Sequence, residues 1–126
     1  RDLGFNTSDR KENIRRAAEF AHMLNDAGLV AICAFLSPHT EDRAMAREII
    51  GPGQFRELYL SAPVETCRAR DESGVYKLAD TGEIEGLSGV TAPYEVPQSP
   101  DLIIPTHEID VQASLELILE FLHAGK

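Results

Sequence analysis

The sequence has 126 residues, enough for one domain of ordinary size but short for a complete nucleotide-binding enzyme. It carries 12 Lys and Arg against 21 Asp and Glu, a formal charge of −9 that disfavours binding to nucleic acid or to an anionic membrane. The longest apolar run, residues 28–36, is far shorter than the ~20 residues of a membrane span. The two cysteines, Cys33 and Cys67, show no CxxC spacing, so we expect free thiols in a soluble, cytoplasmic, single-domain protein.

The first half of the chain alternates helical and strand patterns. Thr7 and Ser8 offer N-cap hydroxyls for a helix over residues 9–27, whose apolar residues recur at helical spacing. Residues 29–36 are continuously apolar, which is typical of a strand buried on both faces of a parallel sheet. A short helix over residues 41–49 follows and ends at the Gly51-Pro52-Gly53 turn.

The second half continues the alternation. A strand is predicted at residues 55–60, a helical segment at 64–70 and a short strand at 101–105. A closing amphipathic helix carries the apolar stripe Val111, Leu115, Ile118 and Leu122. Residues 71–100 are rich in Gly and Pro and show little periodicity, so we predict no regular structure there and suspect a functional lid.

Strands that alternate with helices predict an α/β fold, a three-layer sandwich around a parallel sheet. Ligands of such folds bind beyond the carboxyl ends of the strands, which directs attention to residues 37–39, 61–63 and 106–107. Neither Gly-x-x-x-x-Gly-Lys-Ser/Thr nor Gly-x-Gly-x-x-Gly occurs in the sequence. The four histidines are too scattered to assign metal ligands.

Five of the 12 cations lie within the first sixteen residues. Arg10 and Asn13, three residues apart on one helical face, combine a guanidinium fork with an amide, a pair suited to an anionic ligand with a purine or hydroxyl group. The alternative is a solvated helix face, the commoner fate of a charge run.

Two sets of sequence segments resemble the adenylyl-sulfate kinase family. The first comprises Asp9-Arg-Lys-Glu-Asn-Ile-Arg-Arg16, Ala27-Gly-Leu-Val30 and Phe35-Leu-Ser-Pro38. The second follows the family's lid in order and spacing: Cys67-Arg-Ala-Arg-Asp71, Gly74-Val-Tyr-Lys77, Gly86-Leu-Ser-Gly-Val90 and Pro93-Tyr-Glu-Val-Pro97. The resemblance covers nearly the whole chain.

The resemblance implies a P-loop NTPase-like fold that is incomplete at its N-terminus. Residues 1–126 would form the C-terminal two-thirds of the kinase domain, with a mobile lid at about residues 73–92. The family's Walker A loop, the helix after it and an Asp-Gly-Asp-Asn segment are not among these residues, so we expect this chain alone to be inactive. The strand that leads into that loop would pair with residues 29–36.

The resemblance also implies a reaction: transfer of the γ-phosphate of Mg-ATP to the 3′-hydroxyl of adenosine 5′-phosphosulfate (APS), which yields PAPS. Mg²⁺ would accompany ATP, with its ligands outside this chain. The implied substrate-binding residues are Phe5, Arg10, Asn13, Leu36, Ser37, Gly86 and Leu87. Phe5 would stack on the adenine, and Arg70 and Ile109 would border the ATP adenine.

Ser37 occupies the position that the family labels as a phosphoserine intermediate and is the candidate catalytic residue. Direct in-line transfer between two nucleotides needs no covalent enzyme, so Ser37 could equally be a turn hydroxyl before Pro38.

The lid departs from the family pattern. Ser73, Leu78, Asp80 and Glu85 stand where the family has cations, and Leu87 replaces a Phe that would complete an aromatic sandwich, so we expect weaker substrate clamping. Two alternatives therefore remain: a non-catalytic sulfonucleotide-binding module that regulates a sulfate-activating partner, and a small α/β phosphotransferase with another nucleotide substrate. A homodimer, or a fusion with a sulfate adenylyltransferase, is also compatible with the resemblance.

Overall fold

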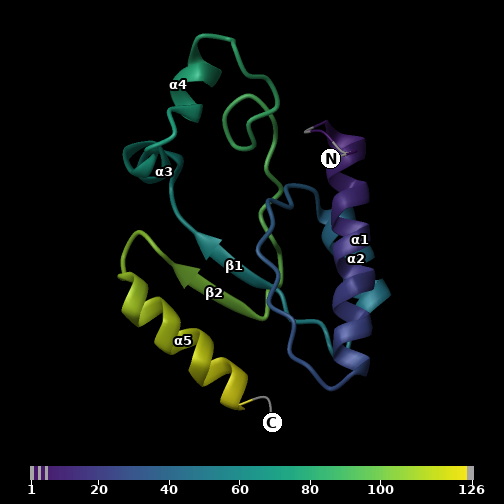
Figure 1. Cartoon of the computed structure of the whole chain (residues 1–126). Helices are drawn as coiled ribbons and strands as arrows, with labels where there is room; N and C mark the ends of the chain where they lie inside the picture. The colour runs from purple at the N-terminus through teal and green to yellow at the C-terminus, as the bar shows by residue number, and fades with distance from the viewer. Residues whose placement is uncertain (1, 3, 5, 125–126) are drawn as a thin grey trace.

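The computed structural model describes residues 2, 4 and 6–124 and contains helices on both sides of a small parallel sheet (Figure 1). Its elements, in chain order, are α1 (Thr7–Asp26), α2 (Thr40–Ile50), β1 (Leu58–Ser61), α3 (Val64–Arg70), α4 (Val75–Asp80), β2 (Leu102–Pro105) and α5 (Val111–Ala124). The predicted α/β alternation is confirmed, and most element bounds lie within about three residues of those expected.

The sheet consists of β1 and β2, which run parallel with Leu58 opposite Leu102 and Leu60 opposite Ile104. The connection between these strands carries α3, α4 and residues 81–100, which we call the lid loop; α3 and α4 follow the carboxyl end of β1, and the lid loop returns to the start of β2 (Figure 1). Helix α5 packs against β2, where Ile104 is fully buried. This arrangement places the loops after both strands on the same edge of the sheet.

Helices α1 and α2 lie side by side and share a small apolar core of Ile14, Ala18 and Ala46. Helix α1 begins differently from the prediction, because Asn6, and neither Thr7 nor Ser8, supplies the N-cap. The Asn6 side-chain oxygen accepts a hydrogen bond from the Asp9 amide at 2.8 Å, and so satisfies one of the free amides of the first turn.

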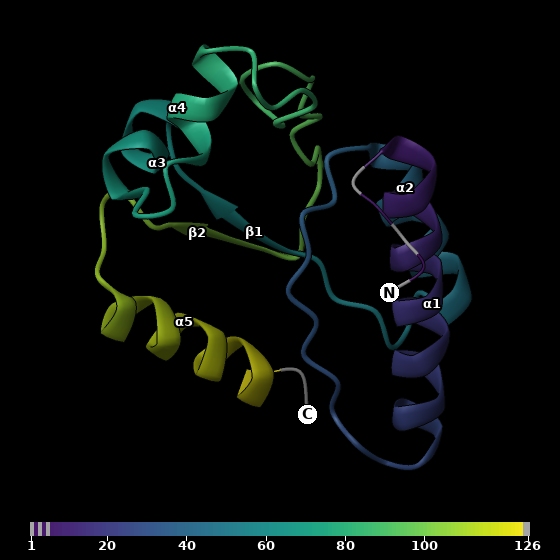
Figure 2. The same ribbon diagram turned by 45° about the horizontal axis from the view of Figure 1, so that its top comes forward.

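The predicted strand at residues 29–36 is wrong for the described part of the chain. The segment is extended, yet it forms no β-ladder with β1 or β2. In both ribbon views it runs between the α1–α2 pair and the sheet (Figure 2). Its side chains are largely open to solvent, with Val30 75% and Ile32 82% exposed. An apolar pattern reports a tendency to be buried, whereas a strand needs a neighbouring backbone as well.

The expectation that residues 71–100 lack regular structure is also wrong, because α4 forms within them. Gly74 precedes α4 with φ of 77°, a left-handed conformation that residues with a Cβ rarely adopt. The remainder, residues 81–100, turns back over the start of α1 and descends toward β2 (Figure 1). The region is therefore a short helix followed by a loop.

The exposed segment 29–36 should make the 126-residue chain, produced alone, associate with itself, because unpaired apolar backbone is a template for strand pairing. We expect Ile32→Lys to shift the chain toward monomer in size-exclusion chromatography with light scattering. Val111→Lys is the matched control, since Val111 is 85% exposed but lies on a helix. A monomeric wild-type chain, or an equal effect of both substitutions, would contradict strand pairing.

Asp42 is a buried carboxylate in the first turn of α2. It is fully buried, and both of its side-chain oxygens find no hydrogen-bond partner among the described residues. It lies one helical turn before Ala46, on the face of α2 that packs against α1. An unsatisfied buried polar group costs about 1–3 kcal/mol, and more when it is charged, whereas the helix dipole returns only about 0.3–1 kcal/mol.

We therefore expect Asp42→Asn to raise the thermal midpoint of the full-length protein, because the desolvation cost outweighs the dipole. Glu41→Gln is the control: Glu41 shares the same helical turn, is exposed and pairs with Lys11 at 3.3 Å, so its loss should lower the midpoint slightly. Scanning calorimetry would measure both. A lower midpoint for Asp42→Asn would mean that this carboxylate has a donor outside the described residues.

Candidate functional site

A cavity of about 470 Å³ lies where α1, the turn after residues 29–36 and the lid loop meet. Helix α1 contributes its first turn, the turn contributes Pro38 and His39, and the lid contributes residues from Glu85 to Pro93. The lining residues are Asn6, Thr7, Arg10, Pro38, His39, Glu85, Gly86, Ser88, Ala92 and Pro93. We call this the α1–lid pocket.

Arg10 connects the two sides of the α1–lid pocket. Its guanidinium donates to the Gly86 carbonyl at 3.2 Å and to the Ser88 hydroxyl at 3.4 Å. Both partners are neutral. Elsewhere on α1, by contrast, Lys11, Arg15 and Arg16 pair with carboxylates. Arg10 therefore presents a charge that no carboxylate among the described residues neutralises, which suits an anionic ligand.

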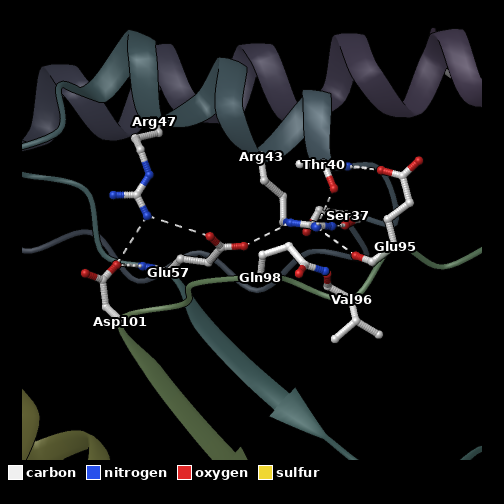
Figure 3. A network of polar contacts seen from close by, with 9 residues as sticks. All are labelled: Ser37, Thr40, Arg43, Arg47, Glu57, Glu95, Val96, Gln98 and Asp101. Atoms are coloured by element: carbon white, nitrogen blue, oxygen red, sulfur yellow. Dashed lines mark hydrogen bonds and ion pairs between the residues drawn. The ribbon is translucent and has the colours of Figure 1, made fainter.

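The turn at residues 37–39 forms the floor of the pocket and is held from α2. The Arg43 guanidinium donates to the Ser37 carbonyl at 2.7 Å and to the Thr40 hydroxyl at 3.1 Å (Figure 3). The same guanidinium donates to the Glu95 carbonyl at 2.7 Å. One side chain thus joins the turn, α2 and the end of the lid.

Arg43 is the centre of a wider polar network that reaches the sheet. Its Nε lies 2.9 Å from a carboxylate oxygen of Glu57, the residue before β1. Arg47, one turn further along α2, approaches Glu57 at 3.7 Å and Asp101 at 3.4 Å. The Asp101 carboxylate also accepts the Glu57 amide at 2.7 Å, beside the start of β2. The network ties α2 to the beginnings of both strands.

Of the residues that the sequence nominated for the substrate, Arg10 and Gly86 line the α1–lid pocket. Ser37 directly precedes the lining residue Pro38 and is half-buried, while Leu36 is exposed. The remaining three are Asn13, Leu87 and Phe5. Asn13 lies on α1 about one turn beyond Arg10 and is exposed; Leu87 is half-buried between Gly86 and Ser88; Phe5 lies outside the described residues.

The two residues nominated for ATP lie together at the carboxyl edge of the sheet. Arg70 ends α3 and donates to the Thr106 carbonyl at 2.6 Å. Ile109 follows in the same loop, where its amide donates to the Pro105 carbonyl at 3.2 Å. Like Arg10, Arg70 binds a neutral oxygen and no carboxylate among the described residues.

The sequence directs attention to His39 as part of residues 37–39 but assigns it no role, and it marks Glu85 only as a departure from the family pattern in the lid. It does not nominate Arg43 or Glu95 for the site. Arg43 gives no signal, because a cation on a short helix is ordinarily solvated, and Glu95 stands in the family-like segment Pro93-Tyr-Glu-Val-Pro97 without an assigned role. Their role depends on a contact across 52 residues of sequence.

The chemistry available to the pocket is binding by hydrogen bonds and charge. Within residues 2, 4 and 6–124, no group of three or more His, Cys, Asp or Glu is arranged to hold a metal ion. Cys33 and Cys67 are both free thiols. In the same part of the chain, no helix combines the length and apolarity that a membrane crossing requires.

Comparison with known proteins decides the family. The family model described as adenylylsulphate kinase matches residues 1–105. The chain belongs to the adenylylsulphate kinase family. It is 45% identical over 125 residues to the adenylyl-sulfate kinase of Staphylococcus carnosus, and 48% identical over 122 residues to a probable adenylyl-sulfate kinase of Halalkalibacterium halodurans. These matches cover 99% and 97% of this chain but 63% and 60% of the relatives.

A solved structure agrees with this family assignment. The Mycobacterium tuberculosis APS kinase in complex with AMPPNP and APS superposes with a TM-score of 0.87 at 35% identity, covering 97% of this chain and 71% of that one. The expected P-loop NTPase-like α/β class is thereby confirmed. The chain of this adenylylsulphate kinase family member spans about three-fifths of the curated relatives it matches.

The Arg10 contacts generate a prediction about the lid. Arg10→Ala removes the two bonds to Gly86 and Ser88, so amide hydrogen exchange over residues 84–92 should become faster in the full-length protein. Arg15→Ala is the control, since Arg15 is on the same helix but pairs with Glu12 and Glu19. Unchanged exchange in Arg10→Ala would mean that these bonds do not order the lid.

Proposed function

We propose that the full-length protein is an adenylyl-sulfate kinase, which transfers the γ-phosphate of ATP to the 3′-hydroxyl of APS and releases PAPS and ADP. The bond between the γ-phosphorus and ADP breaks as a bond to the 3′-oxygen forms, and the hydroxyl loses its proton. The observation that supports this proposal is that Arg10 lies in the α1–lid pocket with only neutral partners. The family membership of the chain supports it as well.

In this proposal the α1–lid pocket holds APS. Arg10 binds the anionic part of the sulfonucleotide and Asn13 its polar groups, while the family resemblance assigns the stacking on adenine to Phe5. Gly86 and Leu87 cover the ligand from the lid, while Leu36 and Ser37 border it from the turn. Ser37 is the candidate catalytic residue and directly precedes Pro38, which lines the pocket.

ATP would lie at the carboxyl edge of β1 and β2, beside Arg70 and Ile109. The bond between Arg70 and the Thr106 carbonyl draws α3 and the loop after β2 together there. The family's use of ATP makes Mg²⁺ the expected metal, which would neutralise charge on the phosphates. The described residues offer no suitable cluster of ligands, so no step here is assigned to the ion.

A second function, a non-catalytic sulfonucleotide-binding module, draws support from Glu85. This exposed carboxylate lines the α1–lid pocket where it would face an anionic ligand. A carboxylate in that place weakens the clamp that the lid exerts, because like charges repel. The proposed cytoplasmic location and the binding of APS are the same for both functions, whereas ATP is a partner only of the kinase.

Assembly is a further part of the proposal. A relative in Rhizobium tropici, named bifunctional enzyme NodQ, is 49% identical over 106 residues, which make up 17% of its length. A solved Thiobacillus denitrificans structure is described as a hexameric APS kinase. These relatives support a homo-oligomer, or a fusion with a sulfate adenylyltransferase, for the full-length protein.

The full-length protein should form PAPS from ATP and APS in a coupled assay of ADP release. Arg10→Ala should raise the KM for APS by roughly tenfold or more, because a hydrogen bond to a charged group contributes about 1.5–3 kcal/mol. Arg56→Ala is the control, since Arg56 also binds only neutral oxygens but does not line the pocket.

Two results would contradict the kinase proposal in different ways. Binding of APS in calorimetry without PAPS formation would favour the regulatory module. Failure to bind APS at all would reject both functions. Equal KM values for Arg10→Ala and wild type would remove Arg10 from the binding site.

A further inference from the structure

Glu95 anchors the end of the lid to the turn that forms the pocket floor. Its amide donates to the Pro38 carbonyl at 2.9 Å, and its carbonyl accepts from Arg43 at 2.7 Å. Its carboxylate accepts from the Thr40 amide at 2.5 Å. Glu95 comes two residues after the lining residue Pro93, so these bonds fix one wall of the pocket against another.

The Glu95 carboxylate also completes the N-terminus of α2. His39 occupies the N-cap position but makes no side-chain capping bond, and the Glu95 carboxylate bonds the free Thr40 amide instead. The amide donor lowers the pKa of Glu95 below its ordinary value of 4.5. Glu95 is therefore ionised near neutral pH, as an anion at a helix N-terminus should be.

Arg43 also connects the turn at residues 37–39 to the end of the lid. Its Nη1 donates to the Ser37 carbonyl and its Nη2 to the Glu95 carbonyl, both at 2.7 Å. A guanidinium is planar, with donors at fixed angles, so two such bonds set the separation of the carbonyls they join. The carboxylate of Glu57, at 2.9 Å from Nε, holds the plane in place (Figure 3).

We propose that Arg43 and Glu95 are positioning residues that set the distance between the pocket floor and the returning lid, and thereby the affinity for the sulfonucleotide. Neither residue lines the α1–lid pocket, so both act through Ser37, Pro38 and the lid rather than on the ligand. The inference rests on the proposed function for the identity of the ligand, and on the contacts above for the geometry.

Arg47 provides a matched contrast on the same helix. It also pairs with Glu57, and with Asp101, but no contact joins it to the turn or to Glu95 within the described residues. Arg43→Lys and Arg47→Lys each keep a positive charge beside Glu57 and lose a guanidinium fork. Only Arg43→Lys removes the bridge between the Ser37 and Glu95 carbonyls.

The first test measures steady-state kinetics of the full-length protein. Arg43→Lys should raise the KM for APS roughly tenfold, the loss expected for about one charged hydrogen bond, with kcat and the KM for ATP within about twofold. Arg47→Lys should leave all three unchanged. Glu95→Gln keeps an oxygen that accepts the Thr40 amide and should raise the KM for APS less than Glu95→Ala does. Equal effects of the two arginine substitutions would overturn the proposal.

The second test does not depend on activity. Amide exchange at Glu95, whose amide binds the Pro38 carbonyl, should be faster in Arg43→Lys and unchanged in Arg47→Lys. If the wild-type protein forms no PAPS but shows this selective change, the proposed function fails and the positioning role stands. If exchange at Glu95 is the same in both variants and in wild type, Arg43 does not hold the lid and the inference is wrong.

Discussion

The buried guanidinium of Arg43 is the constraint on which the site depends. With only 9% of its side chain exposed, it must satisfy its donors inside the protein: it donates to Ser37 and Thr40 at the start of α2 and to Glu95 at the end of the lid, and its Nε forms an ion pair with the Glu57 carboxylate. Removing either member of a largely buried ion pair costs far more than removing an exposed one, because the remaining charge is left without solvent or partner. The apolar cluster of Ile14, Ala18 and Ala46 lies between α1 and α2, whereas the contacts of Arg43 are polar. Ion pairs and hydrogen bonds therefore hold the elements together at this junction, as apolar packing holds α1 against α2.

The helices could be predicted because their signals are local. Apolar spacing over residues 9–27 and the stripe from Val111 to Leu122 each identify a helix without knowledge of what covers it, and α1 and α5 appear where expected. The structure of residues 29–36 could not be predicted in this way. A strand forms only when a neighbouring backbone lies at hydrogen-bonding distance, and the residues of the segment do not specify that neighbour. Helix α4 is missed for a different reason: it has only six residues, too few for a periodic pattern to emerge.

In the candidate site too, features with a local sequence signal could be predicted and features that depend on long-range contacts could not. Arg10 was identified from its place near a helix start and from family strings, and the structure adds that Gly86 and Ser88 are its partners. The contact between Arg43 and Glu95 could not be predicted, because it joins α2 to a loop 52 residues away, although Glu95 itself stands in a family-like segment. A sequence motif can suggest which residues meet a ligand, whereas the contacts that hold those residues in place are recognisable only once the chain is folded.

The distribution of charge explains how an acidic protein can present a site for an anion. The net charge of −9 repels phosphate and sulfate at long range, but this repulsion is screened within about 10 Å at ordinary ionic strength, so short-range contacts decide binding. Most described cations are already neutralised by carboxylates, as Arg68 is by Asp80 at 2.6 Å. Arg10 and Arg70, at the two places proposed for the nucleotides, instead bind neutral oxygens. Their neutral partners hold each guanidinium in place without cancelling its charge, so an arriving anion gains a preorganised partner and displaces no carboxylate to reach it.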